Sequence, residues 1–292
     1  MTQLTDPIIP LLATLGDDDL IYVRATTGSG KTTVKRLAEA VARRIQNRTF
    51  RNLLLNPDMV ANQRAFAGGA LAANVYGFDM WKAGTGGCTL TRGADGLITL
   101  NGPLTQIIEA PALNGTVVFF SVEDATGPIT VRVGDGGANF VEGSFDGAVG
   151  RAGVAVTVPA AVTTDVHVRI TTSGSTSFYR PQLEQGAFFT GFEKRPIPVE
   201  ANLLRRYYQT GVGDIAESYA SAGGQLIGQL FQLRDRMRVN PVVTATRVSD
   251  TNMVDANPTV TVLDPAGFKV TGESSAAGIC TMRFNWVADA SP

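Results

Sequence analysis

A segment near the amino end of the chain carries the residue types of a phosphate-binding loop. Residues 25–32 have the sequence ATTGSGKT, with Ala25 where the strict motif has glycine. In such a loop, backbone N–H groups hold phosphate oxygens, Lys31 would reach the β and γ oxygens, and Thr32 would bind magnesium. The loop also needs a parallel sheet and an acidic magnesium ligand, and the sequence that follows predicts neither. A glycine turn followed by a threonine-capped helix is the favoured interpretation, and nucleotide binding is the minor alternative.

An aromatic cluster with a nearby carboxylate forms a second candidate site. Tyr76, Asp79 and Trp81 lie close together in the sequence. An exposed ring can stack on a sugar face, while a carboxylate accepts hydrogen bonds from sugar hydroxyl groups. The other interpretation, which we favour for Trp81, makes this ring a core residue and Asp79 a turn former. The three residues are therefore a candidate carbohydrate site, with core packing as the alternative.

Three arginines form a third candidate. Residues 230–239 alternate between apolar and polar types, which predicts a strand with Arg234, Arg236 and Arg238 on one face. Such a positive ridge could bind an anionic glycan or the phosphate groups of lipopolysaccharide. A solvated face, or ion pairs across a subunit boundary, is the commoner role of such a stripe.

The sequence predicts no catalytic residue, no metal site and no cofactor. His167 is the only histidine and is expected on the exposed face of a strand, where it is usually just solvated. Glu184 and Glu193 could form a carboxylate pair for glycoside cleavage, but sequence does not set their separation, and Glu184 is expected to hold a turn. Cys88 and Cys280 lie too far apart in sequence to suggest a ligand cluster or a disulfide framework. We therefore expect a protein that is not an enzyme.

The elements that must position these residues change character along the chain. Val34, Leu37, Val41 and Ile45 have helical spacing, which predicts a helix over 32–47 with the narrow apolar seam of a short coiled coil. From about residue 50 the period changes to two. The clearest strand-like segments are 116–122, 129–133, 154–158 and 166–170, with glycine turns between them. Short strands without intervening helices predict a β-sandwich or jelly roll.

A proline-rich connector at 195–198 precedes a second β-rich region. Residues 202–209 have helical spacing, and further strands are predicted at 241–247, 259–263, 267–271 and 279–287. The predicted fold class is thus mainly β. Residues 1–50 form a short N-terminal segment with a helix, 51–197 a jelly-roll β-sandwich, and 198–292 a smaller C-terminal β domain.

Composition excludes several classes of protein. The chain of 292 residues is 44% hydrophobic and only 17% charged, which argues against a disordered protein. Its net charge of −1 argues against a nucleic-acid partner. The amino end lacks the positive start and long apolar run of a signal peptide, and no window is apolar enough for a membrane span. We expect synthesis in the cytoplasm and no membrane insertion.

Several short motifs resemble one family. Residues 52–59 (NLLLNPDM), 62–64 (NQR) and 76–81 (YGFDMW) resemble the opening of jelly-roll modules in bacteriophage tail fibres. Residues 178–186 (FYRPQLEQG) and 190–196 (TGFEKRP) resemble their last strand, in modules that are similar to carbohydrate-binding modules. Residues 204–209 (LRRYYQ), 237–241 (MRVNP) and 286–290 (WVADA) resemble the domains that follow them, and 17–23 (DDDLIYV) resembles a particle-attachment segment. Where the family usually has Asp-Arg-Trp, this chain has DMW at 79–81, which puts any contact made by that arginine in doubt.

The resemblance implies a tail fibre or a head spike of a bacteriophage or gene transfer agent. Such a protein is a homotrimer located in the virion, it meets other virion proteins through its N-terminal segment, and it attaches to a host-surface glycan. A fibre-borne depolymerase that cleaves the glycan is the enzymatic alternative.

Overall fold

The structure, a computed structural model, describes residues 20–25, 28–33, 50–254 and 256–292. Every strand pairing in this part of the chain is antiparallel, and one helix accompanies the strands. The prediction of a mainly β fold is confirmed. In the described residues no helix is long and apolar enough to cross a membrane.

Strands β1 (Leu20–Ala25) and β2 (Gly28–Thr33) form a two-stranded hairpin. Tyr22 is the cross-strand partner of Lys31, and Ile21 is the partner of Thr32. A phosphate loop places its lysine and threonine where the loop meets a helix, whereas both lie here within an extended strand. The phosphate-loop hypothesis is therefore wrong, and Thr32 and Thr33, where the predicted helix would begin, are strand residues. The remainder of the helix predicted over 32–47 lies, from residue 34 onward, outside the described residues.

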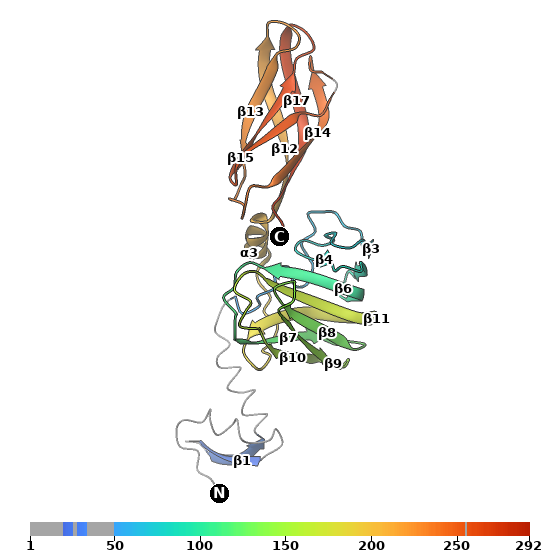
Figure 1. Cartoon of the computed structure of the whole chain (residues 1–292), viewed down its shortest axis with the longest axis vertical. Coiled ribbons are helices and arrows are strands. Elements are labelled where there is room, and N and C mark those ends of the chain that lie inside the picture. The colour runs from blue at the N-terminus through green and yellow to red at the C-terminus, as the bar shows by residue number, and fades with distance from the viewer. Residues whose placement is uncertain (1–19, 26–27, 34–49, 255) are drawn as a thin grey trace.

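The middle of the chain folds into a β-sandwich of the jelly-roll type (Figure 1). Its strands are β3 (Gly69–Leu71), β4 (Lys82–Ala83), β5 (Cys88–Arg92), β6 (Ile98–Ile108), β7 (Val117–Glu123), β8 (Ile129–Gly134), β9 (Phe140–Phe145), β10 (Arg151–Thr157) and β11 (Val166–Gln185). The hydrogen-bonded order is β10-β7-β11-β6-β5-β3. In addition, β4 pairs with β6, β8 pairs with β11, and β9 pairs with β8. The four strand segments predicted before residue 171 all fall on these strands.

The long strand β11 belongs to both layers of the sandwich. Its first half pairs with β6 and β8, and its last residues pair with β7. The register shifts between Thr172 and Thr176 and again between Tyr179 and Gln182, so the strand can turn from one sheet into the other. Alternate side chains of these strands fill the core between the layers, among them Val131, Leu104, Val168, Phe120 and Phe178. The side chains between them point outward and are the ones available for binding.

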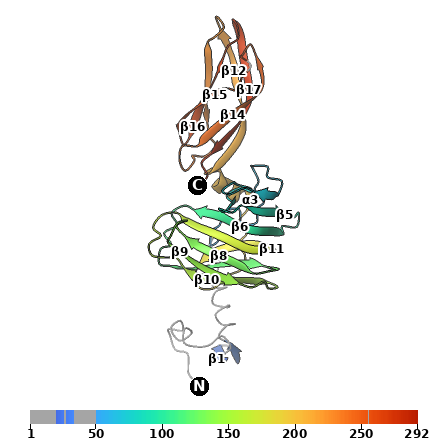
Figure 2. The same ribbon diagram turned by 45° about the vertical axis from the view of Figure 1, so that its right-hand side comes forward.

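Helix α3 (Ile197–Arg205) lies between the first sandwich and the C-terminal strands in both views of the chain (Figures 1 and 2). It begins earlier than the predicted 202–209 because Pro198 fits the first turn of a helix, where no N–H donor is needed. It ends before Tyr208, which begins β12. Leu204 of the helix and Tyr207 pack against Met80 of the sandwich in a small separate cluster.

The C-terminal strands form two three-stranded sheets packed face to face. The strands are β12 (Tyr208–Ala220), β13 (Leu226–Gln232), β14 (Val242–Thr251), β15 (Thr259–Asp264), β16 (Gly267–Glu273) and β17 (Gly278–Asp289), in the orders β12-β17-β14 and β13-β16-β15. Their core contains a ring cluster in which Phe231 stacks on Phe268 at 5.6 Å between centroids and meets Phe284 edge-on at 5.2 Å.

The strand predicted over 230–239 is only partly present, because β13 ends at Gln232. The N–H groups of Leu233 and Met237 donate to the carbonyl oxygens of Ala266 and Pro265, in the turn between β15 and β16. Both side chains are buried. The segment after Gln232 therefore wraps around that turn, and its apolar residues reach the core without an extended strand.

Candidate functional site

Trp81 lies in the core of the first sandwich and is 0% exposed. Its Nε1–H donates to the carbonyl oxygen of Asn56 at 2.8 Å. Asp79 is 1% exposed, and its carboxylate accepts the N–H of Gln63 at 3.1 Å on both oxygens. Neither side chain can meet a sugar, so their assignment to a carbohydrate site is wrong, and the packing interpretation accounts for both.

Tyr76 belongs to the junction between the two sandwiches. Its hydroxyl donates to the carbonyl oxygen of Pro292, and its ring lies 4.6 Å from the Arg64 guanidinium, which also sits 4.0 Å over the ring of Tyr208. The same guanidinium pairs with Asp289 at 2.9 Å. Burial raises the pKa of Tyr76 above its ordinary value. The ring is thus engaged by its own chain and is removed from the carbohydrate site.

The three C-terminal arginines do not share a strand face. Arg234 and Arg236 are exposed, whereas Arg238 lies against the first sandwich, 3.9 Å from Glu109 and 3.7 Å from Asp165. The predicted ridge fails because the backbone after Gln232 is not extended. Arg238 is an ion-pairing residue of the junction.

Both glutamates considered as a catalytic pair are occupied by hydrogen bonds. Glu184 accepts from the N–H of Thr190 at 2.7 Å and from its hydroxyl at 2.6 Å, so it holds the loop after β11, as expected. Glu193 accepts from the backbone N–H groups of Phe50 and Asn52 at 2.5 and 2.6 Å. These bonds occupy both carboxylates with the protein's own backbone and loop donors, so the structure does not present them as a catalytic pair.

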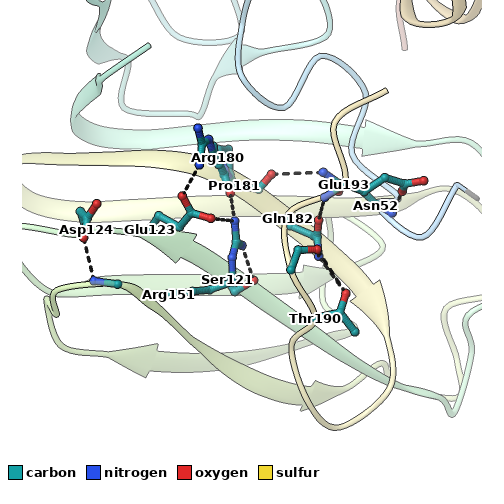
Figure 3. A network of polar contacts seen from close by, with 12 residues as sticks. Asn52, Ser121, Glu123, Asp124, Arg151, Arg180, Pro181, Gln182, Thr190 and Glu193 are labelled. Carbon is teal, nitrogen blue, oxygen red and sulfur yellow. Dashed lines mark hydrogen bonds and ion pairs between the residues drawn. The ribbon is translucent and has the colours of Figure 1, made fainter. Parts of the chain in front are cut away.

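The outer face of the β10-β7-β11 sheet is likewise engaged with itself (Figure 3). Arg151 donates to the Ser121 hydroxyl at 2.8 Å and to Glu123 at 2.8 Å, and Arg180 donates to the other oxygen of Glu123 at 2.9 Å. Gln182, close by on β11, bonds Glu184 at 2.9 Å. In this polar network each arginine is bonded to Glu123 and Gln182 is bonded to Glu184, so we do not place the site there.

The opposite sheet, β9-β8-β11-β6, presents a different outer face. With β4 added on β6, the register aligns one outward row across five strands, formed by Glu142, Arg132, Arg169, Thr105 and Lys82. Directly opposed residues of an antiparallel pair point to the same side of the sheet, so these side chains are neighbours. A second row beside the first contains Phe140, Gly134, His167 and Ile107. We call the two rows together the arginine face.

Arg132 is held in place on this face. Its guanidinium carbon lies 3.2 Å from the centroid of the Phe140 ring, and it donates to the carbonyl oxygen of Gly137 at 2.9 Å. Phe140 remains 41% exposed. Contact between a guanidinium and a ring fixes both groups without consuming every donor of the arginine.

Arg169, at the centre of the row, has no such partner. No hydrogen bond or ion pair joins it to any residue that the structure describes, and its Nε is buried without an acceptor. The hydroxyl oxygen of its cross-strand neighbour Thr105 is also buried and unbonded. Buried polar atoms are normally hydrogen-bonded. Arg151 in the sheet of Figure 3 also has a buried Nε without an acceptor, but its other two guanidinium nitrogens bond Ser121 and Glu123, whereas no hydrogen bond joins the guanidinium of Arg169 to a described residue.

The electrostatics of the face follow from its positive charges. Burial lowers the pKa of His167, the positive charges of Lys82 and Arg169 lower it further, and Asp165 and Asp135 act in the opposite direction. The imidazole is therefore neutral at pH 7 and can both donate and accept hydrogen bonds. The arrangement can bind hydroxyl and anionic groups, and it contains no activated nucleophile.

Elsewhere the described residues supply little chemistry. Burial raises the pKa of the Cys88 thiol to about 11, which keeps it protonated and unreactive at neutral pH. No cluster of three or more His, Cys, Asp or Glu side chains in the described ranges is arranged to hold a metal ion.

One part of the arginine face could have been predicted from the sequence. Arg132 and Arg169 are the polar members of two predicted strands, 129–133 and 166–170, in which the apolar residues alternate with them. Their outward direction was predictable from that alternation. Their alignment on neighbouring strands depends on register, and no local pattern carries it.

Comparison with known proteins adds no identification. No protein-family model matches the chain, and no curated protein matches it. Among solved structures, discoidin II of Dictyostelium discoideum is similar at 12% identity, covering 80% of this chain and 94% of that one, with a TM-score of 0.26. TmCBM61 in complex with beta-1,4-galactotriose is similar at 15% identity, covering 47% of this chain and 99% of that one, with a TM-score of 0.27. The PBSX exported protein XepA is similar at 10% identity, covering 78% of this chain and 88% of that one, with a TM-score of 0.17. Scores this low do not establish a shared fold, so the candidate site rests on its own geometry.

Proposed function

We propose that this chain is a non-enzymatic adhesion subunit of a virion fibre or spike, and that it binds a host-surface glycan through the arginine face. The observation that carries the binding part is the unpaired Arg169, which lies on an outward strand face with Arg132 and His167 beside it. The virion part is supported by the sequence motifs that resemble bacteriophage tail fibres.

Binding without turnover is supported by the state of the acidic side chains. Glu184 and Glu193 are both committed to backbone and loop hydrogen bonds. Glycoside hydrolysis uses one carboxylic acid and one carboxylate on either side of the scissile bond. A strand face with hydrogen-bonding groups and no such pair suits recognition of the glycan.

The proposal includes self-association into a trimer. The C-terminal sandwich exposes large apolar side chains on its outer faces and at the end distant from α3, namely Tyr219, Leu226, Leu230 and Val242. Burying these side chains against other subunits would remove apolar surface from water, which favours association. Three identical glycan sites on one assembly would raise the overall affinity by avidity, without a tight contact at any one site.

The experiment that tests the function uses the full chain and polysaccharide purified from the surface of a bacterium to which the virion adsorbs. We expect concentration-dependent retention of the protein, no release of reducing ends, and a trimer mass by light scattering. Absence of retention would overturn the adhesion function. Released reducing ends would establish the depolymerase instead, and a strict monomer would remove the avidity mechanism.

A further inference from the structure

Two arginines of the arginine face are direct cross-strand partners. Arg132 on β8 is opposite Arg169 on β11, with Thr105 next in the row and Lys82 beyond it. Strands in a sheet lie about 4.8 Å apart, so the row from Arg132 to Lys82 extends over about 14 Å. Like charges placed directly opposite each other destabilise a sheet. This arrangement therefore opposes folding unless a negative group lies nearby.

The acidic residues around the row do not supply that group at its centre. Glu142 faces Arg132 from the outer strand β9. Asp135 accepts hydrogen bonds from Gly137 at 2.7 Å and from the Asn139 side chain at 2.7 Å. Asp165 accepts the N–H of Ala110 at 3.0 Å and lies 3.7 Å from Arg238. Within the described residues, Arg169 is left without an anionic partner.

The groups on either side of Arg169 are already positioned. Phe140 and the Gly137 carbonyl hold Arg132. Lys82 donates to the carbonyl oxygen of Pro292 at 2.9 Å and lies 5.5 Å from the Tyr76 ring. Side chains that are held before binding lose less conformational entropy when a ligand arrives. The site thus has fixed cations at its sides and an unpaired guanidinium between them.

We propose that the arginine face binds an acidic saccharide, with a carboxylate or phosphate group of the sugar seated against Arg169 between Arg132 and Lys82. This inference rests on the proposed glycan-binding function and names the class of glycan. The planar guanidinium of Arg169 matches either anion through two parallel hydrogen bonds, and a bound anion offsets the repulsion between the two arginines. Neutral His167 in the adjacent row can bond the sugar hydroxyls.

The test measures binding of the full chain to polymer pairs that differ only in charge. Polygalacturonate and its carboxyl-reduced form test the carboxylate, and phosphomannan and its dephosphorylated form test the phosphate. We expect at least one acidic polymer to bind more than tenfold tighter than its neutral counterpart, with weaker binding as salt increases.

The variant Arg169→Met keeps the apolar stem of the side chain and removes the charge. It is expected to lose at least tenfold in affinity for the acidic polymer, with an unfolding midpoint equal to or above that of the wild type because one opposed charge is gone. Arg180→Met is the matched control, since it removes an exposed arginine of the same strand that bonds Glu123 in the other sheet. It is expected to bind as the wild type does.

Each contrary result has a distinct meaning. Equal binding of the acidic and neutral forms overturns the acidic class while leaving glycan adhesion in place. Equal losses in Arg169→Met and Arg180→Met show a general charge effect and overturn the assignment to the arginine face. Binding to none of the four polymers and to no host polysaccharide overturns both this inference and the proposed function.

Discussion

Replacing Trp81 by phenylalanine tests whether this ring is a core residue or a sugar platform. The ring is fully buried, and its Nε1–H bonds the Asn56 carbonyl at 2.8 Å. Phenylalanine removes three ring atoms, which at about 0.8 kcal/mol per buried carbon group costs about 2 kcal/mol. The lost hydrogen bond adds about 1 kcal/mol. The Asn56 carbonyl still accepts the N–H of Met59 at 3.0 Å, so no buried acceptor is left without a donor.

We therefore expect Trp81→Phe to lower the free energy of unfolding by about 3 kcal/mol. For a unit of this size, that corresponds to a fall of roughly 6–12 °C in the unfolding midpoint, followed by circular dichroism. The folded variant should bind polysaccharide as the wild type does. Trp286→Phe is the control, and it should cost less because that ring is partly exposed and donates no hydrogen bond to a described residue. A variant of Trp81 with wild-type stability and no glycan binding would refute this reasoning.

Three further perturbations test the junction and the sandwich. Arg64→Ala removes the ion pair with Asp289 and the contacts with two tyrosine rings. We expect the free energy of unfolding to fall by about 2 kcal/mol and calorimetry to show two transitions in place of one. An unchanged calorimetric trace would contradict this. The hydrogen bond from Arg206 holds the pKa of Glu109 below its usual range. The ionised Glu109 carboxylate therefore stabilises the folded protein above about pH 4, and this contribution is lost as the pH falls further. Comparing unfolding midpoints between pH 7 and pH 3 should therefore show a smaller acid loss for Glu109→Gln than for the wild type, and identical profiles would exclude this role. Gly153→Ala should lower the free energy of unfolding in urea by about 1–3 kcal/mol, because the new Cβ would lie 2.0 Å from the Phe120 carbonyl oxygen. The control Gly174→Ala places its Cβ in open space and should leave that free energy unchanged. Equal effects of the two changes would contradict the packing at Gly153.

The alternation of apolar and polar residues determined much of the architecture. Residues 129–133 and 166–170 predict strands, and both are strands with their apolar members in the core. The hydrogen bonds of Glu184 to the loop after β11 were also expected from its position. These predictions are correct because each depends on residues near one another in the sequence. At that range the direction of a side chain follows from the period of the backbone alone.

Other features depended on contacts that no local pattern contains. Gly28–Thr33 forms a strand and not a phosphate-binding loop, because Leu20–Ala25 supplies a partner strand. Residues 233–240 leave the predicted strand, because the turn at Pro265 accepts their N–H groups. The sequence favours a core position for Trp81, but the residues that bury it belong to distant strands of the sandwich.

The candidate site belongs to this second kind. Arg132 and Arg169 are far apart in the sequence, and each is an ordinary outward residue of its own strand. The register between β8 and β11 makes them neighbours, and the burial of Thr105 completes the unpaired group. Local sequence decides which way a side chain points, whereas only the pairing of distant strands decides what it points beside.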